Sequence, residues 1–427
     1  LSHSCNLSAM SWNLGNTALA AVTAVPDGRI AMVPDAATRS ARGANRPGLV
    51  GSILRLFPLH PEPSMALQCG IVGLPNVGKS TLFNALTRAA VAADNYPFCT
   101  IDPNVGVVAV PDSRLEKIAE ITKPGETVPT VMEFVDIAGL VAGASHGEGV
   151  GHQFLGHIRD TDAIVHIVRC FEDPDIAHVT GTIDPIADIE TINLELALAD
   201  EATMDRAIDR TERRGKAGDK TAAKLLEPLT RVRDHLDRGL PARILDLNTD
   251  ERQAIREYHL LTLKPMMYVA NIEEASEHDN RYVQLVQERG RAEGADVVVI
   301  CAAMESEIAQ LDDADRAEFL ADIGETEPGL NRVIHAAYHM LDLGTFFTHN
   351  EKQATAWTFR HGMTAPQAAG RIHTDFEKGF IRAEVVHYDD FIEHNGEHGA
   401  REAGRWHLEG KDYVVQEGDV ILFRFNV

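Results

Sequence analysis

The sequence has few cysteines and no close pair of them. Its five cysteines are spread over 427 residues and form no Cys-x-x-Cys motif; they are Cys5, Cys69, Cys99, Cys170 and Cys301. This spacing excludes the usual zinc-binding patterns and argues against a disulfide framework. Because a reducing compartment fits this cysteine usage, we expect a cytoplasmic protein.

Long hydrophobic runs and positive charge are also scarce. No apolar run approaches the roughly 20 residues that a membrane-spanning helix needs, so no membrane contact is predicted. Only 40 basic residues stand against 64 acidic ones, and the formal net charge of −24 repels phosphate backbones over most of the surface. Any contact with nucleic acid must therefore use a local basic patch.

Residues 1–64 have a composition of their own. Ser, Ala, Asn and Pro are frequent, acidic residues are almost absent, and no helical or strand period is sustained. Met65 opens the strand-like run that follows, which favours Met65 as the start and 1–64 as a non-native or dispensable extension. The competing interpretation is a transit peptide, because the stretch carries arginines and few acids, although it lacks a well-formed amphipathic helix.

Two patterns predict the architecture that follows. From Cys69 to Cys301 short apolar runs alternate with helical stretches, which indicates an α/β fold with a mostly parallel sheet. A long helical insertion interrupts this alternation. Apolar residues recur along its two arms at helical spacing, with Leu194 among them, and this predicts an antiparallel hairpin.

After Leu343 the apolar runs become short and glycine-containing turns separate them, which predicts a small β-rich domain. Its expected strands include 355–359, 380–386, 412–415 and 420–425. We therefore expect an α/β domain in residues 65–189 and 261–343, the helical insertion in 190–260 and the β-rich domain in 344–427.

The turn between the two helical arms carries a basic cluster in an otherwise acidic chain. Its members are Arg213, Arg214, Lys216 and Lys220, with Lys224 one helical turn later. A run of charge is usually a solvated loop, but the sign here opposes the global charge, which favours contact with phosphate groups. Both interpretations stay open from the sequence alone.

The strongest motif is a phosphate-binding loop. Residues 73–80 read Gly-Leu-Pro-Asn-Val-Gly-Lys-Ser, which matches G-x-x-x-x-G-K-[ST] and follows an apolar strand. Backbone N–H groups of such a loop wrap the phosphates, Lys79 reaches the β/γ-phosphates and the Ser80 hydroxyl ligates Mg²⁺. The residues predicted to bind nucleotide here are Asn76, Val77, Gly78, Lys79, Ser80 and Thr81.

Two further segments complete a magnesium-dependent site. Asp-Ile-Ala-Gly at 136–139 ends an apolar run, so Asp136 is expected to hold Mg²⁺ and the Gly139 amide to face the γ-phosphate. In the turn-rich segment 96–104, Thr100 is a candidate Mg²⁺ ligand and switch residue. The alternative for this segment is a simple helix-to-strand loop.

The chain resembles the Obg-like ATPase (YchF) family of translation-factor-class P-loop proteins over residues 65–427. Five stretches carry the resemblance: Gly-Leu-Pro-Asn-Val-Gly-Lys-Ser, Pro-Phe-Cys-Thr-Ile-Asp-Pro-Asn, Phe-Val-Asp-Ile-Ala-Gly-Leu-Val, Asn-Ile-Glu-Glu and the terminal Asp-Val-Ile-Leu-Phe-Arg-Phe-Asn-Val. The resemblance implies a P-loop NTPase domain, a coiled-coil insertion and a C-terminal, β-grasp-like TGS domain. It also implies ATP hydrolysis, association with the ribosome and a role in translation or the stress response.

Residues 271–274 bear on the choice of base. GTPases of this class read guanine with Asn-Lys-x-Asp, whereas this chain has Asn-Ile-Glu-Glu. The Lys that covers the ring is absent and the Glu274 carboxylate lies one methylene further out, so the paired contacts to guanine are lost. Adenine is therefore favoured over the alternative of an Obg-type GTPase. The expected base contacts are Asn271, the Ile272 backbone, Glu274, Ala302 and Ala303.

The residue that positions the attacking water is the weakest part of the pattern. Leu140 stands where Ras-like enzymes have Gln, so intrinsic hydrolysis should be slow. The resemblance suggests a replacement histidine, for which His166 on an expected strand is the candidate. His146 and His152 are local alternatives, and a histidine on a strand is often a buried core residue.

Leu140 leads to two further hypotheses. Without a water-positioning side chain, charge on the β–γ bridging oxygen needs another cation, and the Asn76 amide oxygen is a candidate ligand for K⁺. This idea rests partly on the family resemblance. Alternatively, the chain is a nucleotide-gated RNA- or ribosome-binding protein in which hydrolysis is incidental.

Overall fold

The computed structural model describes residues 67–88, 104–137, 150–176, 181–273 and 280–426. Its first part is a six-stranded sheet with the order β2-β4-β1-β5-β6-β7. Only β2 is antiparallel to its neighbour, which confirms the predicted mostly parallel α/β fold. The strands are β1 (Gln68–Val72), β2 (Val105–Ala109), β4 (Val131–Asp136), β5 (Ala163–Arg169), β6 (Met266–Asn271) and β7 (Val297–Ile300).

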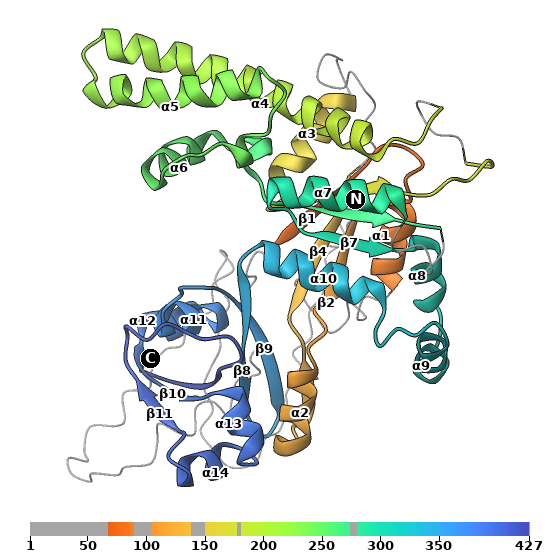
Figure 1. Cartoon of the computed structure of the whole chain (residues 1–427). Coiled ribbons are helices and arrows are strands. Elements are labelled where there is room, and N and C mark those ends of the chain that lie inside the picture. Colours follow the sequence, from red (N-terminus) through yellow and green to blue (C-terminus); the bar gives the residue numbers. More distant parts are fainter. Residues whose placement is uncertain (1–66, 89–103, 138–149, 177–180, 274–279, 427) are drawn as a thin grey trace, which may run out of the picture. The chain divides into compact units, whose positions relative to one another are not determined.

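Every residue of β5 and β6 is buried, as expected of central parallel strands covered on both faces. Helices α7 and α10 cover opposite faces of the sheet (Figure 1). The helices of this part are α1 (Lys79–Arg88), α3 (Val150–Asp160), α7 (Arg281–Glu293), α8 (Ala302–Ile308), α9 (Asp313–Asp322) and α10 (Gly329–Met340). Among the described helices, none combines the length and apolar character needed to cross a membrane.

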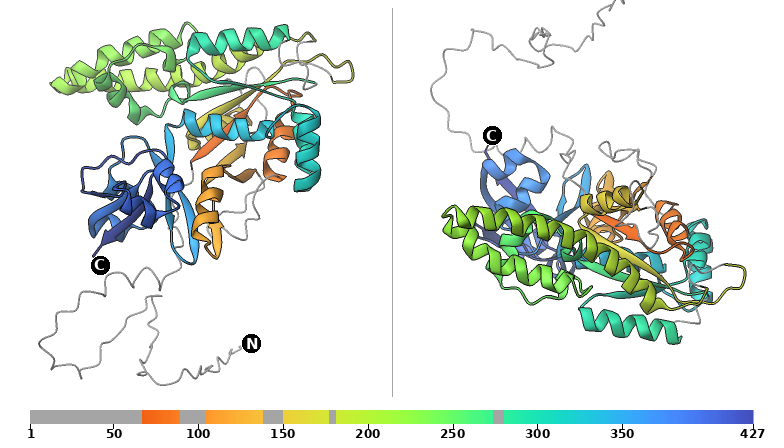
Figure 2. Two further views of the ribbon diagram at one scale, coloured as in Figure 1. Left: turned by 60° about the horizontal axis from the view of Figure 1, so that its bottom comes forward. Right: turned by 90° about the horizontal axis from the view of Figure 1, so that it is seen from above.

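Two long helices, α4 (Pro185–Lys216) and α5 (Lys220–Leu236), form the predicted hairpin and lie side by side (Figure 2). The side chains of Asp184 and Asp219 cap their N-termini, which explains why each helix starts where it does. Ala197, Met204 and Leu229 belong to the core between them. Leu194, expected on the apolar face, is instead 47% exposed, because the start of α4 packs on the α/β core through other residues.

The chain returns from the hairpin through short helices. These are η3 (Ala242–Ile244), α6 (Thr249–Ile255), η4 (Arg256–Tyr258) and η5 (Leu261–Leu263). Buried Asp200 of α4 holds the end of this return, because its carboxylate accepts hydrogen bonds from the backbone of Leu261 and Thr262 at 2.9 and 2.7 Å. These hydrogen bonds hold the last part of the insertion against α4.

A second six-stranded sheet has the order β11-β10-β12-β8-β9-β3, which confirms the β-rich C-terminal domain. Its C-terminal strands are β8 (Leu343–His349), β9 (Gln353–Arg360), β10 (Phe380–Val386), β11 (His407–Glu409) and β12 (Val420–Phe425). Its helices are α11 (Ala365–Ile372), α12 (Thr374–Lys378), α13 (Tyr388–Glu393) and α14 (Glu397–Glu402). The strand expected at 412–415 is absent from this described part, where Val414 makes only an isolated bridge to Thr364.

The second sheet also contains a strand from the first half of the chain. β3 (Glu126–Val128) is parallel to β9, and α2 (Ser113–Thr122) lies beside β9 (Figure 1). Both elements fall within residues 65–189, which were expected to belong to the α/β domain, but they pair and pack with the C-terminal sheet. The reason is visible in α2, whose Leu115 and Ile118 are buried in the core of that domain.

Candidate nucleotide-binding site

The phosphate-binding motif forms the loop between β1 and α1. Gly78 adopts φ 94°, and a Cβ atom there would lie 2.2 Å from the Asn271 side-chain nitrogen. Asn76 also lies in the left-handed region, with φ 64°. Glycine is needed at 78 for both its backbone conformation and this close approach, while asparagine tolerates the turn at 76.

Lys79 and Asp136 meet at this edge of the sheet. The Lys79 ammonium donates to the Asp136 carboxylate, and their side chains are 11% and 19% exposed. Asp136 ends β4 directly beside Ile71 of β1, and its backbone N–H donates to the Asn104 carbonyl at 2.8 Å. The structure therefore brings together the two side chains predicted to bind the phosphates and the metal, those of Lys79 and Asp136.

The residues at this edge have the oxygen chemistry that Mg²⁺ requires. Ser80 is exposed on the first turn of α1, next to the Lys79–Asp136 pair. Hydroxyl and carboxylate oxygens are suitable ligands for Mg²⁺, which is a hard cation. The Asp136 carboxylate already binds one positive group, the Lys79 ammonium. Thr100 and Gly139 lie outside the described residues.

Asn271 connects the phosphate-binding loop to the loop after β7. Its side-chain nitrogen donates to the Val77 carbonyl and its side-chain oxygen accepts from the Ala302 N–H, both at 2.9 Å. Asn271 is 4% exposed, so this bridge is part of the core. Asn271, predicted to contact the base, thus also positions the loop that carries the phosphate-binding motif.

The other expected base contacts differ in accessibility. The Ile272 N–H donates to the Ile300 carbonyl at 2.9 Å, so it is already engaged in the sheet. Ala302 is buried at the start of α8, whereas Ala303 is exposed. The Cys301 thiol donates to the Glu273 carbonyl at 2.9 Å and ties these two loops together. Glu274 lies outside the described residues.

His166 lies in the core of the sheet and is 1% exposed. Its backbone pairs with Val72 of β1, but its ring packs on Tyr268 of β6 at 5.6 Å between ring centroids. Burial, with a smaller effect of Arg243, lowers the pKa of His166 to about 3, so the ring is neutral. Within the described chain neither ring nitrogen has a partner, and a core role fits this geometry better than contact with a water at the nucleotide.

His146 lies outside the described residues, and the side chain of His152 is not described. The structure therefore does not test either alternative to His166.

Arg169 is a residue that the sequence analysis missed. It ends β5, is 1% exposed, and its guanidinium donates to three carbonyl oxygens at 3.0 to 3.2 Å, those of Phe171, Asp173 and Ile176. Arg169 thus shapes the segment after β5 at the nucleotide edge. The only signal in the sequence was a single arginine at the end of an apolar run.

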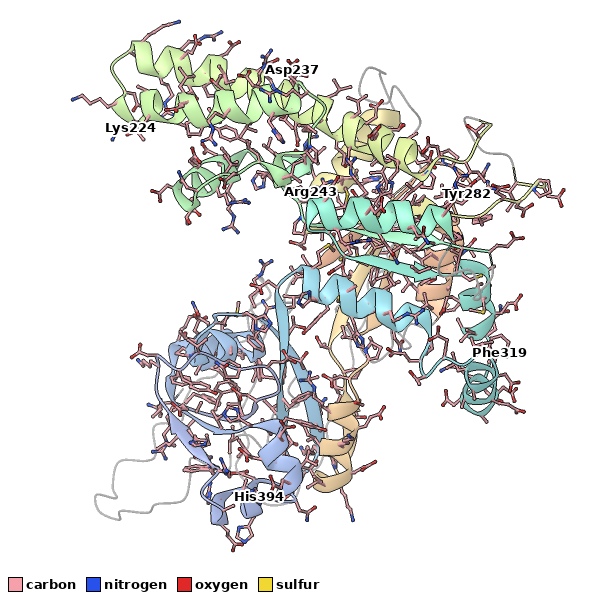
Figure 3. The ribbon with its side chains drawn as sticks, viewed as in Figure 1. Lys224, Asp237, Arg243, Tyr282, Phe319 and His394 are labelled. Atoms are coloured by element: carbon pink, nitrogen blue, oxygen red, sulfur yellow. The ribbon has the colours of Figure 1, made fainter. Side chains whose placement is uncertain are left out.

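The basic cluster lies at the tip of the hairpin, where Figure 3 labels Lys224. Arg214 pairs with Asp219 at 2.8 Å, and Lys216 pairs with Glu212 at 3.1 Å. Arg213 and Lys220 are also exposed, and no ion pair is recorded for either among the described residues. The cluster is therefore partly neutralised within the tip, and the exposed side chains of Arg213, Lys220 and Lys224 carry its remaining accessible charge.

Comparisons with known proteins agree with this geometry. A family profile described as a 50S ribosome-binding GTPase matches residues 68–200. The profile YchF-GTPase_C, described as a protein of unknown function, matches residues 343–426. The first covers the phosphate-binding loop and the second covers almost all of the β-rich domain.

Similar proteins span most of the chain. The "Ribosome-binding ATPase YchF" of Haemophilus influenzae is 60% identical over 363 residues, which is 85% of this chain and 100% of that protein. The Bacillus subtilis protein of the same name is 53% identical over 366 residues, again 85% of this chain and 100% of that protein. The solved structure of the Schizosaccharomyces pombe YchF GTPase has a TM-score of 0.77 at 35% identity and covers 85% of this chain and 99% of its own. This chain therefore belongs to the YchF family.

Proposed function

We propose that this chain is a cytoplasmic P-loop switch protein that binds and hydrolyses ATP, associates with the ribosome and regulates translation or the stress response. The observation that carries the proposal is the Lys79–Asp136 pair beside an intact phosphate-binding loop. The relatives named ribosome-binding ATPases, at 53% to 60% identity over their whole length, support the same function.

The phosphates would lie in the loop formed by Asn76 to Thr81. Lys79 would leave Asp136 and bind the β- and γ-phosphates, because their negative charge exceeds that of one carboxylate. Ser80, Thr100 and Asp136 would hold Mg²⁺, and the Gly139 amide would face the γ-phosphate. When bound, Mg²⁺ neutralises charge on the transferred phosphoryl group.

Adenine is the preferred base in this proposal. The side-chain nitrogen of Asn271 carries two hydrogens, and one of them is donated to the Val77 carbonyl. The second hydrogen would be donated to a ring nitrogen of adenine. The Ile272 carbonyl, Glu274, Ala302 and Ala303 would complete the base site. No lysine covers the ring, which disfavours guanine.

Potassium is the second proposed cofactor, with the Asn76 amide oxygen as its protein ligand. The competing role of Asn76 is purely conformational, because φ 64° is a backbone conformation in which asparagine is enriched. A substitution that removes the Asn76 amide but still allows a positive φ distinguishes potassium binding from the conformational role.

Ribosome contact is assigned to the tip residues Arg213, Arg214, Lys216 and Lys220 and to the TGS domain. Exposed positive charge at the end of a long hairpin is suited to ribosomal RNA, because the rest of this acidic chain repels phosphate.

The second candidate function is a nucleotide-gated ribosome-binding protein in which hydrolysis is incidental, and Leu140 favours it. Multiple-turnover phosphate release with and without purified ribosomes separates the two. Stimulated turnover that Lys79→Ala abolishes supports the ATPase switch. Nucleotide-dependent ribosome binding with unchanged, near-zero turnover would support the second function instead.

A further inference from the structure

Residues 111–129, here called the bridging segment, leave the nucleotide-binding sheet and join the other one. The segment contains α2 and β3 and lies between β2 and β4 in the chain. β3 is the edge strand of the C-terminal sheet, with Glu126, Thr127 and Val128 paired with Gln353, Ala354 and Thr355 of β9. The chain therefore passes from β2 of the nucleotide-binding sheet into the C-terminal domain and returns to form β4.

The bridging segment is built into the C-terminal domain and does not simply touch it. Leu115 and Ile118 of α2 are 4% and 0% exposed and share a hydrophobic core with Phe347 and Phe391. The Gly125 N–H donates to the Glu351 carbonyl at 3.3 Å. A shift of the segment must therefore displace core side chains of the C-terminal domain.

Arg114 fastens the segment to the turn before β12. Its guanidinium donates to Asp112, the N-cap of α2, and to Glu417 at 2.6 Å, and it lies over the Phe347 ring at 5.3 Å. Burial opposes the charged form, but Asp112 and Glu417 outweigh it and raise the pKa of Arg114 above its ordinary value, so the guanidinium stays charged. Glu417 also accepts from the Thr345 N–H at 2.8 Å, which links the turn to β8.

The other end of the same chain stretch lies at the nucleotide site. β2 and β4 are paired over five positions, and the Val110 N–H donates to the Thr130 carbonyl at 2.9 Å beside the bridging segment. β4 ends at Asp136, the partner of Lys79. At about 3.3 Å per residue, β4 spans roughly 20 Å from Asp136 to the bridging segment.

We propose that β2, β4 and the bridging segment form a mechanical link. Through this link, a nucleotide at the phosphate-binding loop changes the conformation and dynamics of the C-terminal domain. The link rests on the proposed function, because it starts when phosphates draw Lys79 from Asp136. β2 is an edge strand that pairs with β4 alone among the described strands, so it can follow a shift of β4 without breaking pairs with another strand. The buried side of α2 then transmits the movement to the C-terminal core.

Hydrogen exchange on the full chain tests this link. Amide exchange in β9 and α13 is measured with and without Mg²⁺ and the non-hydrolysable analogue AMP-PNP, for wild type, Arg114→Ala and Glu417→Gln. Glu417→Gln removes one charge but keeps an oxygen for the Thr345 N–H. Arg382→Ala is the matched control, because Arg382 is exposed on β10 of the same domain, away from α2.

We expect nucleotide to change exchange in β9 and α13 by about fivefold or more in wild type and in Arg382→Ala. The response should be lost or much reduced in Arg114→Ala and Glu417→Gln, at nucleotide concentrations that a titration shows to be saturating. No response in nucleotide-bound wild type, or an unchanged response in both coupling variants, would overturn the link. Failure of wild type to bind the nucleotide at all would instead count against the proposed function.

Discussion

At the scale of single residues, Asn76 allows a clean test of the potassium proposal. Alanine at a residue with φ 64° would strain the loop by about 1 kcal/mol or more, so Asn76→Ala mixes two effects. Asn76→Gly removes the amide oxygen and keeps the left-handed conformation accessible. We predict that KCl accelerates single-turnover ATP hydrolysis over NaCl at equal ionic strength in wild type, and that Asn76→Gly loses this difference.

Equal wild-type rates in the two salts would rule out the potassium site. If Asn76→Gly kept the full potassium effect, the cation would have to use other ligands, and Asn76 would be a turn residue only.

His166 makes the stability of the protein depend on pH. Its pKa is about 3 in the folded chain and 6.5 as the ordinary value, so the unfolded chain binds the additional proton between these limits. Stability is therefore fully present above pH 6.5 and falls as the pH drops towards 3, by about 1.4 kcal/mol per unit at most. We predict that His166→Phe, which keeps an aromatic ring beside Tyr268, loses less stability than wild type between pH 6.5 and 5.

Urea unfolding at the two pH values measures this difference, which should be about 1.6 kcal/mol. Burial also lowers the pKa of His349, so some pH dependence remains in the variant. Identical pH dependence in wild type and His166→Phe would show that folding leaves the pKa of His166 at its ordinary value and would contradict this prediction.

At the scale of elements, the positive charge of the hairpin tip is expected to contribute to ribosome binding. We predict that Arg213→Glu with Lys220→Glu weakens co-sedimentation with ribosomes, because both side chains are exposed and free of recorded ion pairs in the described structure. The salt dependence of binding should become shallower, by roughly one to two units of log–log slope. Basal ATP hydrolysis should not change, since the tip is remote from the phosphate-binding loop.

The double variant Arg256→Glu with Arg291→Glu is the control, because it makes the same change in net charge at exposed sites away from the tip. Equal loss of ribosome binding in both double variants would show that only net charge matters. No loss in either would leave the tip as a solvated loop.

Elements with a clear sequence period were predictable, and those defined by distant partners were not. The apolar runs of β5 and β6 and the caps Asp184 and Asp219 are local signals. β3 has only three residues and exists because β9 pairs with it. Residues 412–415 have a strand-like composition, but within the described residues Val414 makes only an isolated bridge to Thr364 and no ladder forms.

At the scale of the whole molecule, the sequence predicts a set of residues for the nucleotide site but does not predict how they depend on one another. The phosphate-binding motif and Asp136 are local patterns, and the structure brings them together. The bridge from Asn271 to Val77 and Ala302, the core position of His166 and the docking of α2 in another domain depend on three-dimensional packing. The direction in which a side chain points, and the packing of a helix in another domain, produce no periodic pattern in a single sequence.

The preference for ATP over GTP tests the central claim most directly. Calorimetric titration of Mg²⁺-loaded full-length protein with each nucleotide measures it, with Lys79→Ala as the control that should bind neither. The account predicts that ATP binds at least about tenfold more tightly, a difference of roughly 1.4 kcal/mol, because Asn-Ile-Glu-Glu at 271–274 lacks the contacts that read guanine. Equal affinities, or tighter binding of GTP, would contradict it.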